Sequence, residues 1–127
     1  MIEVKNLVKT FDRFRALDDL TLTVPQGSIY GLVGPNGAGK STVIRHITGV
    51  MRQDSGSVTI GGQPIYENVA IKSKMANIPD DLFHYPQANI REMKRFYQGI
   101  YPGFDTILYE KLKEIFQLDE KQPMRRL

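Results

Sequence analysis

A glycine-rich stretch that ends in a lysine and two hydroxyl residues has the clearest chemical capability in the sequence. Residues 34–42 read Gly-Pro-Asn-Gly-Ala-Gly-Lys-Ser-Thr and satisfy the pattern G-x-x-x-x-G-K-[ST]. Glycines allow the positive φ angles at which successive backbone N–H groups converge on an anion. The stretch therefore predicts a loop that binds nucleotide phosphates. The alternative without a binding function is a glycine turn with a solvated lysine.

Each side chain at the end of this phosphate loop suits one part of a magnesium–nucleotide complex. Lys40 supplies a mobile positive charge for the β- and γ-phosphates, and the Ser41 hydroxyl is a hard oxygen ligand for Mg²⁺. Thr42 can reach the α-phosphate, and the N-terminus of a following helix adds about half a positive charge. The predicted nucleotide-binding residues of the loop are Asn36, Gly37, Ala38, Gly39, Lys40, Ser41 and Thr42.

The sequence on either side of the loop predicts the strand and the helix that such a loop requires. Residues 29–33 form a short apolar run bounded by glycines, as expected of a buried strand. Residues 41–50 place apolar side chains at helical spacing, and Gly49 weakens the end of this helix. The loop would then lie between a buried strand and a helix N-terminus.

Two further strands are predicted before the loop, over Ile2 to Phe11 and over Ala16 to Val24, where apolar residues alternate with polar ones. Residues 25–27 then form a turn, and a later strand over 57–60 ends at two glycines. Small-molecule kinases and small GTPases usually begin with the strand of the phosphate loop. The 33 residues before Gly34 therefore disfavour a phosphate-loop kinase.

The second half of the sequence predicts helices. Residues 71–78 are ambiguous, and Pro79 ends that segment. Residues 89–101 carry apolar and aromatic side chains at helical spacing. Asp105 is a candidate N-cap for another helix that continues to Phe116.

Composition limits the classes of function. The chain has 127 residues, 41% of them hydrophobic, with 17 basic and 14 acidic side chains, which is typical of a globular domain. The absence of cysteine excludes disulfides and thiol nucleophiles. No apolar run approaches the ~18 residues of a membrane helix, and Glu3 interrupts any signal peptide. We expect a soluble, cytoplasmic protein with an anionic ligand and no nucleic acid.

Several stretches around the loop share a family pattern: residues 2–7 (Ile-Glu-Val-Lys-Asn-Leu), 9–11 (Lys-Thr-Phe), 16–22, 27–42 and 54–62. Together they resemble the ATP-binding subunit of an ABC (ATP-binding cassette) transporter. The resemblance implies an α/β fold with a phosphate-loop NTPase core of ABC type, an N-terminal antiparallel β subdomain and the start of a helical subdomain. We expect residues 1–80 to form the β subdomain and core, and residues 81–127 the start of the helical part.

The resemblance also implies a function. Such a subunit binds ATP and Mg²⁺, forms a dimer with a second ATP-binding subunit, and couples hydrolysis to transport through an integral membrane subunit. The chain would then lie at the inner face of the membrane. Two alternatives stay open: a nucleotide-binding half-protein without turnover, and a soluble ABC protein that acts on ribosomes or DNA.

An aromatic residue early in such subunits stacks on adenine, and Phe11 stands at that position, with Ala16 beside the sugar or the base edge. A flat ring stacks on any base with about 1–3 kcal/mol. The alternative is that Phe11 ends its strand in the core, and the neighbouring Phe14 could take its place.

The family also has a glutamine that contacts Mg²⁺, and Asp80 stands at about its place in this sequence. A carboxylate can coordinate Mg²⁺, so Ser41 and Asp80 are the predicted metal ligands. Some bacterial exporters are similar at this position, which favours an exporter. The alternative is that Asp80 and Asp81 cap a helix after Pro79.

The remaining aromatic, histidine and arginine residues have plainer interpretations. The helical part has an aromatic set that either docks a membrane subunit or, as its spacing favours, forms core. We expect His46 and His84 to be solvated or to cap a helix, and the terminal Arg125 and Arg126 to be solvated. The aromatic set is Phe83, Tyr85, Phe96, Tyr97, Tyr101 and Phe104.

The family chemistry needs parts that residues 1–127 do not contain. They are a Ser-Gly-rich signature, an apolar strand that ends in Asp followed by a water-polarising Glu, and a later His. We therefore predict no catalytic residue in this chain, which looks like the N-terminal half of such a protein. We expect it to bind ATP without efficient hydrolysis and, when isolated, to be marginally stable or self-associating.

Overall fold

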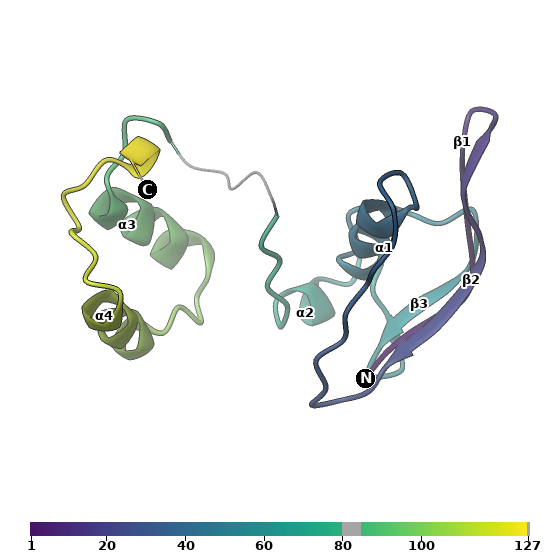
Figure 1. Cartoon of the computed structure of the whole chain (residues 1–127). Helices are drawn as coiled ribbons and strands as arrows, with labels where there is room; N and C mark the ends of the chain where they lie inside the picture. The colour runs from purple at the N-terminus through teal and green to yellow at the C-terminus, as the bar shows by residue number, and fades with distance from the viewer. Residues whose placement is uncertain (80–84, 127) are drawn as a thin grey trace. The chain divides into compact units, whose positions relative to one another are not determined.

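The computed structural model describes residues 1–79 and 85–126 of the chain. It divides into two compact units, Met1–Asn77 and Ile78–Leu127 (Figure 1). The predicted magnesium ligand Asp80, together with Asp81, Phe83 and His84, lies outside the described residues. None of the helices in the described part is both long and apolar enough to cross a membrane.

The first unit is built on a four-stranded antiparallel sheet with the order β2-β1-β3-β4. The strands β1 (Ile2–Phe11) and β2 (Phe14–Val24) form a long hairpin, and β1 also pairs with β3 (Ser55–Ile60). A short strand, β4 (Gln63–Pro64), closes the other edge after the positive-φ glycines at 61 and 62. The predicted strands over 2–11, 16–24 and 57–60 are confirmed, with β2 and β3 each beginning two residues earlier.

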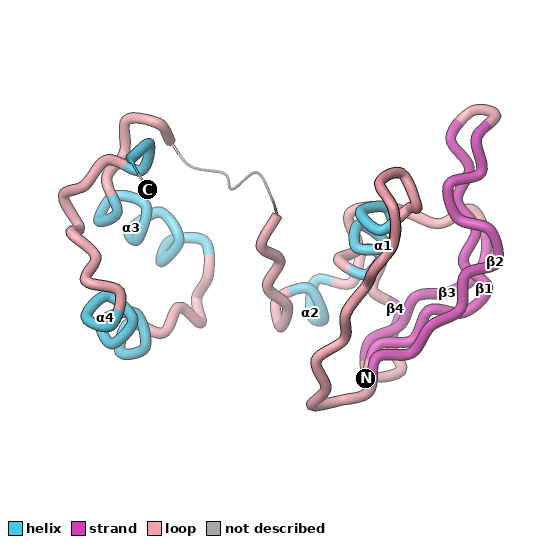
Figure 2. The backbone as a smooth tube through the Cα atoms, in the orientation of Figure 1, coloured by secondary structure: helices cyan, strands magenta, loops and turns pink. Residues whose placement is uncertain are grey.

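The helix α1 (Lys40–Ile47) packs on this sheet and closes the core of the first unit (Figure 2). Its Val43 side chain joins buried residues from β1, β2 and β3 and from the loop after β4. Burial of such aliphatic side chains contributes about 1.5–3 kcal/mol each. The core cluster consists of Val4, Leu7, Leu17, Val43, Val58 and Ile65.

The helix ends earlier than the predicted residue 50, because the chain turns back at Gly49. The amide of Gly49 donates to the carbonyl of His46 (3.0 Å), and the amide of Val50 donates to the carbonyl of Arg45 (2.9 Å). With Gly49 at φ 67°, this is the Schellman arrangement that terminates a helix. A Cβ at Gly49 would also lie 3.1 Å from the side chain of Ile65. Glycine is therefore favoured here both because it leaves room for Ile65 and because it adopts the positive φ.

The predicted strand over residues 29–33 is wrong. This segment has no regular secondary structure, and its Ile29 and Val33 side chains are almost completely exposed. A strand needs backbone partners, and no residue in the described part of the chain pairs with this segment. The run is apolar enough for a buried strand, but a strand also requires neighbouring strands to pair with, which its own composition cannot reveal.

The second unit contains two helices whose starts are fixed by side-chain caps. In α3 (Ile90–Ile100) the Asn89 side chain accepts from the amide of Glu92, whose carboxylate accepts from the amide of Asn89. In α4 (Thr106–Ile115) the Asp105 side chain accepts from the amide of Leu108 at 2.8 Å. Both predicted helices are confirmed, each within one residue. Short helices, α2 (Val69–Lys72) and η1 (Met124–Arg126), complete the described elements.

Ion pairs link α3 to α4 and to the segment that follows it. The Lys94 ammonium lies 2.6 Å from the Glu110 carboxylate and 3.8 Å from that of Glu120. Hydrogen bonds from Lys113 and then from Lys94 hold the pKa of Glu110 below its ordinary value. Because Lys94 is mostly buried, its two acidic partners tie the helices together more effectively than an exposed pair would.

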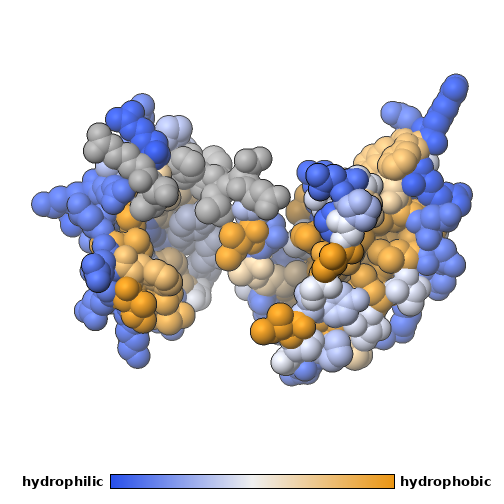
Figure 3. Space-filling view, in the orientation of Figure 1, coloured by the Kyte–Doolittle hydropathy of each residue, from blue (hydrophilic) through white to orange (hydrophobic). Residues whose placement is uncertain are grey.

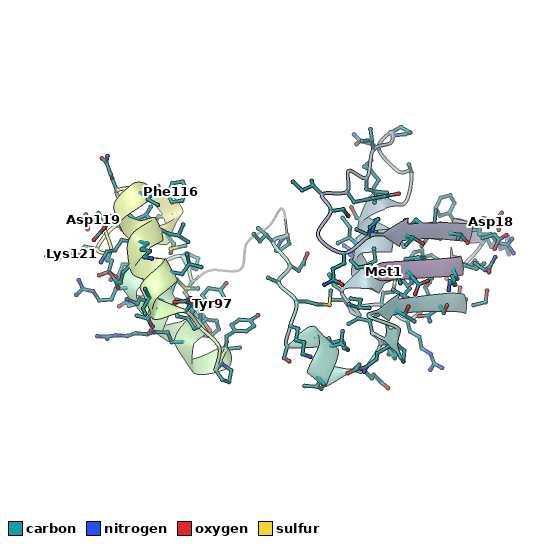
Figure 4. All side chains as sticks on the ribbon, turned by 90° about the horizontal axis from the view of Figure 1, so that it is seen from below. Met1, Asp18, Tyr97, Phe116, Asp119 and Lys121 are labelled. Atoms are coloured by element: carbon teal, nitrogen blue, oxygen red, sulfur yellow. The ribbon has the colours of Figure 1, made fainter. Side chains whose placement is uncertain are left out.

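Four members of the aromatic set form a partly exposed cluster in this unit, Tyr85, Phe96, Tyr97 and Tyr101, whereas Phe104 lies against Tyr109. Tyr85 meets the edge of Phe96 at 5.5 Å, and Tyr97 stacks on Tyr101 at 6.1 Å between ring centroids. None of these rings belongs to the buried residues of the unit, which are Ala88, Ile90 and Met93. Figure 4 labels Tyr97 on α3 and Phe116 at the end of α4, and apolar side chains reach the surface of both units (Figure 3).

The exposed segment 29–33 leads to a prediction about association. We expect the 127-residue chain to self-associate, because exposed apolar residues on an extended backbone offer both hydrogen-bonding groups and apolar surface. Replacement Val33→Lys should shift the chain toward monomer in size-exclusion chromatography with light scattering. The control is Val69→Lys, since Val33 and Val69 are 91% and 78% exposed. A parent chain that is monomeric and melts cooperatively would contradict the prediction.

Candidate nucleotide-binding site

The phosphate loop enters α1 through two glycines in the left-handed region. Gly37 and Gly39 have φ angles of 84° and 85°, and Gly39 is the N-cap of α1. Because glycine has no side chain, no side-chain cap occupies the first-turn N–H groups of α1. These amides and the dipole of the helix leave the N-terminus of α1 open to an anion, as the motif predicts, and binding itself stays a prediction.

The Lys40 side chain folds back over the loop. Its ammonium donates to the carbonyl oxygens of Gly34 and Pro35, both at 2.7 Å. The loop is further closed by the amide of Ala38, which donates to the carbonyl of Pro35 at 3.2 Å. Lys40 thus holds its charge at the loop itself and not in the surrounding solvent.

The end of the loop lies directly against β2. A Cβ placed on Gly39 would be 2.9 Å from the carbonyl oxygen of Ala16 and 2.9 Å from Cδ2 of Leu17. Only glycine fits this gap, and only glycine adopts the required φ without strain. The structure therefore brings Ala16, a predicted site residue, to the phosphate loop.

The remaining loop residues are open to a ligand. Asn36, Gly37 and Ala38 are exposed, and so is Ser41 in the first turn of α1, while Thr42 is half-buried. The Ser41 hydroxyl is therefore accessible as a hard oxygen ligand, which fits a Mg²⁺ that takes its other ligands from phosphates and water. The described part of the chain has no cluster of three or more acidic, histidine or cysteine side chains that would hold a metal by itself.

Phe11 lies at the turn of the β1–β2 hairpin and not in the core. Its side chain is 40% exposed, and its partner across the hairpin, Phe14, is more exposed still. In Figure 1 the hairpin tip and the loop before α1 both point toward the top of the first unit. The predicted alternative of a core phenylalanine is therefore wrong, whereas Phe14 stays available as a second ring.

Sequence reasoning missed Asp54. Its carboxylate accepts from the Lys9 ammonium (2.7 Å) and from the amide of Thr10 (2.7 Å), next to Phe11. These two hydrogen bonds, that of Lys9 first, hold the pKa of Asp54 below its ordinary value. The partners are 45 and 44 residues apart in the chain, so no local spacing pattern could reveal the contact.

The expectation that His46 is solvated or capping is wrong, because the residue is buried with 1% exposure. Its Nδ1 lies 2.7 Å from the carbonyl oxygen of Thr42, so Nδ1 must carry the hydrogen. Its Nε2 is buried and has no hydrogen-bond partner in the described part of the chain. The spacing of His46 from Val43, three residues apart on one helix face, was a signal for burial.

Comparison with known proteins decides the family. The family described as ABC transporter matches residues 17–126. The chain belongs to the ABC transporter ATP-binding family. It is 35% identical over 125 residues to "SkfA peptide export ATP-binding protein SkfE" of Bacillus subtilis, covering 95% of this chain and 52% of that protein. It is also 45% identical over 69 residues to "Energy-dependent translational throttle protein EttA" of Haemophilus influenzae, covering 54% of this chain and 12% of that protein.

Solved structures agree with this assignment to the ABC family. One is described as "Structure of ATP binding subunit of ABC transporter" and has a TM-score of 0.72 and 32% sequence identity. The match covers 87% of this chain and 46% of the chain in that structure. The predicted α/β ABC fold is thereby confirmed. These relatives match most of this chain, but the chain spans only about half of their length.

The unpartnered nitrogen of His46 gives a stability prediction. Replacement His46→Leu should raise the free energy of unfolding by about 1 kcal/mol, because it removes a buried polar atom without a partner and keeps an apolar side chain beside Val43. Urea unfolding followed by circular dichroism measures the effect. The exposed neighbour Arg45→Leu is the control and should change little. A large loss of stability in His46→Leu would show that the imidazole is fully satisfied in solution.

Proposed function

We propose that this chain binds MgATP as the nucleotide-binding part of an ABC transporter subunit. The observation that carries the proposal is the geometry of the phosphate loop. Uncapped first-turn amides of α1 and the Lys40 ammonium converge on one loop, which Gly39 anchors to β2. The family generally uses ATP, typically with Mg²⁺.

Each part of the nucleotide has a proposed partner. The loop amides at residues 36–39 and the Lys40 side chain hold the β- and γ-phosphates, and Thr42 contacts the α-phosphate. Ser41 and Asp80 are the proposed Mg²⁺ ligands. Phe11 stacks on the base, and Ala16 lies beside the sugar or the base edge. The bound Mg²⁺ neutralises phosphate charge when it is present.

Transport is a property of the proposed assembly and not of this chain alone. We propose that two ATP-binding subunits hydrolyse ATP together and drive an integral membrane subunit at the inner, cytoplasmic face of the membrane. The likeness to SkfE, a protein named for peptide export, supports an exporter. The partly exposed aromatic cluster of the second unit supplies apolar surface for docking to a membrane subunit.

A second candidate is a non-transport ABC protein, which the likeness to the translational throttle protein EttA favours. A third is a nucleotide-binding half-protein without turnover. Copurification with an integral membrane subunit distinguishes the first candidate from the second. Steady-state release of phosphate distinguishes turnover from binding alone.

Removal of the loop lysine tests the phosphate site. Replacement Lys40→Ala should weaken MgATP binding about 10- to 100-fold, or about 1.4–2.7 kcal/mol, because charge-assisted bonds to phosphate are lost. Isothermal titration calorimetry measures the affinity, and circular dichroism should show an unchanged fold. Lys74→Ala, which removes an exposed lysine after α2, is the matched control. An affinity equal to that of the parent would refute the phosphate-loop assignment.

A single tryptophan tests the base platform, since the sequence contains none. In Phe11→Trp, addition of ATP should quench tryptophan emission through stacking, whereas inorganic triphosphate should leave it unchanged. Phe14→Trp, across the hairpin, is the comparison. Quenching in Phe14→Trp without quenching in Phe11→Trp would move the platform to residue 14.

A further inference from the structure

Asp54, the residue directly before β3, continues the pairing with β1 past the start of β3. The last partners of these strands are Val8 and Ser55. Just beyond them, the amide of Asp54 donates to the carbonyl of Val8 at 3.0 Å, and its Oδ2 accepts from the amide of Thr10 at 2.7 Å. A side chain therefore satisfies the backbone group that a longer strand would have satisfied. The residue fixed in this way directly precedes Phe11.

The same carboxylate also acts on the ring of Phe11, through Lys9. The Lys9 ammonium donates to Oδ1 of Asp54 at 2.7 Å and lies 5.6 Å from the centroid of the Phe11 ring. The Lys9 side chain is only 18% exposed, so its position is well defined by packing. A cation at this distance from a ring face attracts the ring. Asp54 therefore restrains Phe11 by two routes, the backbone of Thr10 and the ammonium of Lys9.

Such a restraint matters because of where Phe11 lies. It is the last residue of β1 before the hairpin turn, where its strand partner is the exposed Phe14 and where β3 no longer pairs with β1. A ring that is free to rotate loses conformational entropy when a base stacks on it, and a ring already held in place loses less. Hydrogen bonds from Lys9 and Thr10 lower the pKa of the Asp54 carboxyl group, so its charge persists to a lower pH than that of an ordinary aspartate.

We propose that Asp54 and Lys9 are positioning residues that hold Phe11 as a platform for the nucleotide base, and so determine how strongly the site prefers a nucleotide to a bare polyphosphate. This inference rests on the proposed role of Phe11. Neither residue touches the phosphates in the proposal, because the Lys9 charge is already paired with a carboxylate.

An alternative explanation is that Lys9 simply attracts the anionic ligand. The two explanations predict different effects of removing the positive charge of Lys9 and the negative charge of Asp54. If Lys9 merely attracted anions, its removal would weaken the binding of any polyphosphate. Removal of the Asp54 charge would then strengthen that binding. A positioning pair instead predicts that both removals lower base-dependent affinity.

The test compares ATP with inorganic triphosphate on the 127-residue chain by calorimetry. The base preference is the Kd for triphosphate divided by the Kd for ATP. We expect Lys9→Met and Asp54→Asn each to lower the base preference about three- to tenfold. Lys9→Arg should retain it within about twofold, because a guanidinium keeps both the ion pair and the contact with the ring.

Two sets of controls isolate the route through the ring. In a Phe11→Ala background, neither Lys9→Met nor Asp54→Asn should lower the base preference further. The pair Lys5 and Glu3, 3.0 Å apart on the same strand, is the matched control, and Lys5→Met and Glu3→Gln should leave the base preference unchanged. Lys9→Met leaves the hydrogen bond between Asp54 and Thr10 in place, so it tests the ring even where Asp54→Asn fails to fold.

The outcomes are distinct. Opposite shifts for Lys9→Met and Asp54→Asn, or no shift in Lys9→Met, overturn the inference and leave the phosphate-loop proposal intact. A parent chain that binds ATP no more tightly than triphosphate overturns the role of Phe11 and this inference with it. A parent chain that binds neither ligand overturns the proposed function itself.

Discussion

The close approach of Gly39 to the backbone of Ala16 is the contact on which the candidate site depends. It sets the start of α1 against β2, so that Val43, one turn into the helix, reaches the core with Leu17. Any side chain at residue 39 would push α1 away from the sheet and open that core. The proposed phosphate binding needs the positive φ of Gly39, and the packing of α1 on β2 needs its lack of a Cβ, so both depend on the same glycine.

Two polar side chains of the first unit, Asp54 and His46, differ in how fully their hydrogen-bonding groups are satisfied. Asp54 is ionised, and it is satisfied by an ammonium and an amide. His46 is nearly inaccessible, and only one of its nitrogens has a partner in the described part of the chain. An unpaired buried polar atom costs free energy that the surrounding apolar contacts must offset.

Sequence patterns predicted those features that depend on contacts between residues close together in the chain. Helices α3 and α4 begin directly after their N-caps Asn89 and Asp105, within one residue of the predicted starts, because a cap bonds to a residue only three positions away. The loop at 34–42 was also predictable, since its motif is contiguous. The strand at 29–33 failed because pairing depends on distant neighbours. The Asp54 contacts were missed for the same reason, as they join residues on different strands and turns.

Two lysines of the first unit illustrate how partners assign roles to identical side chains. Lys9 faces a carboxylate, and a phosphate would have to compete with a full opposite charge to displace it. Within the described part of the chain, Lys40 donates to neutral carbonyls of its own loop. An arriving phosphate would offer this ammonium a full negative charge in place of neutral carbonyls, so under the proposed function it would exchange with them. Under the proposed function the loop therefore keeps one cation available for the phosphates, while the hairpin keeps the other paired with Asp54.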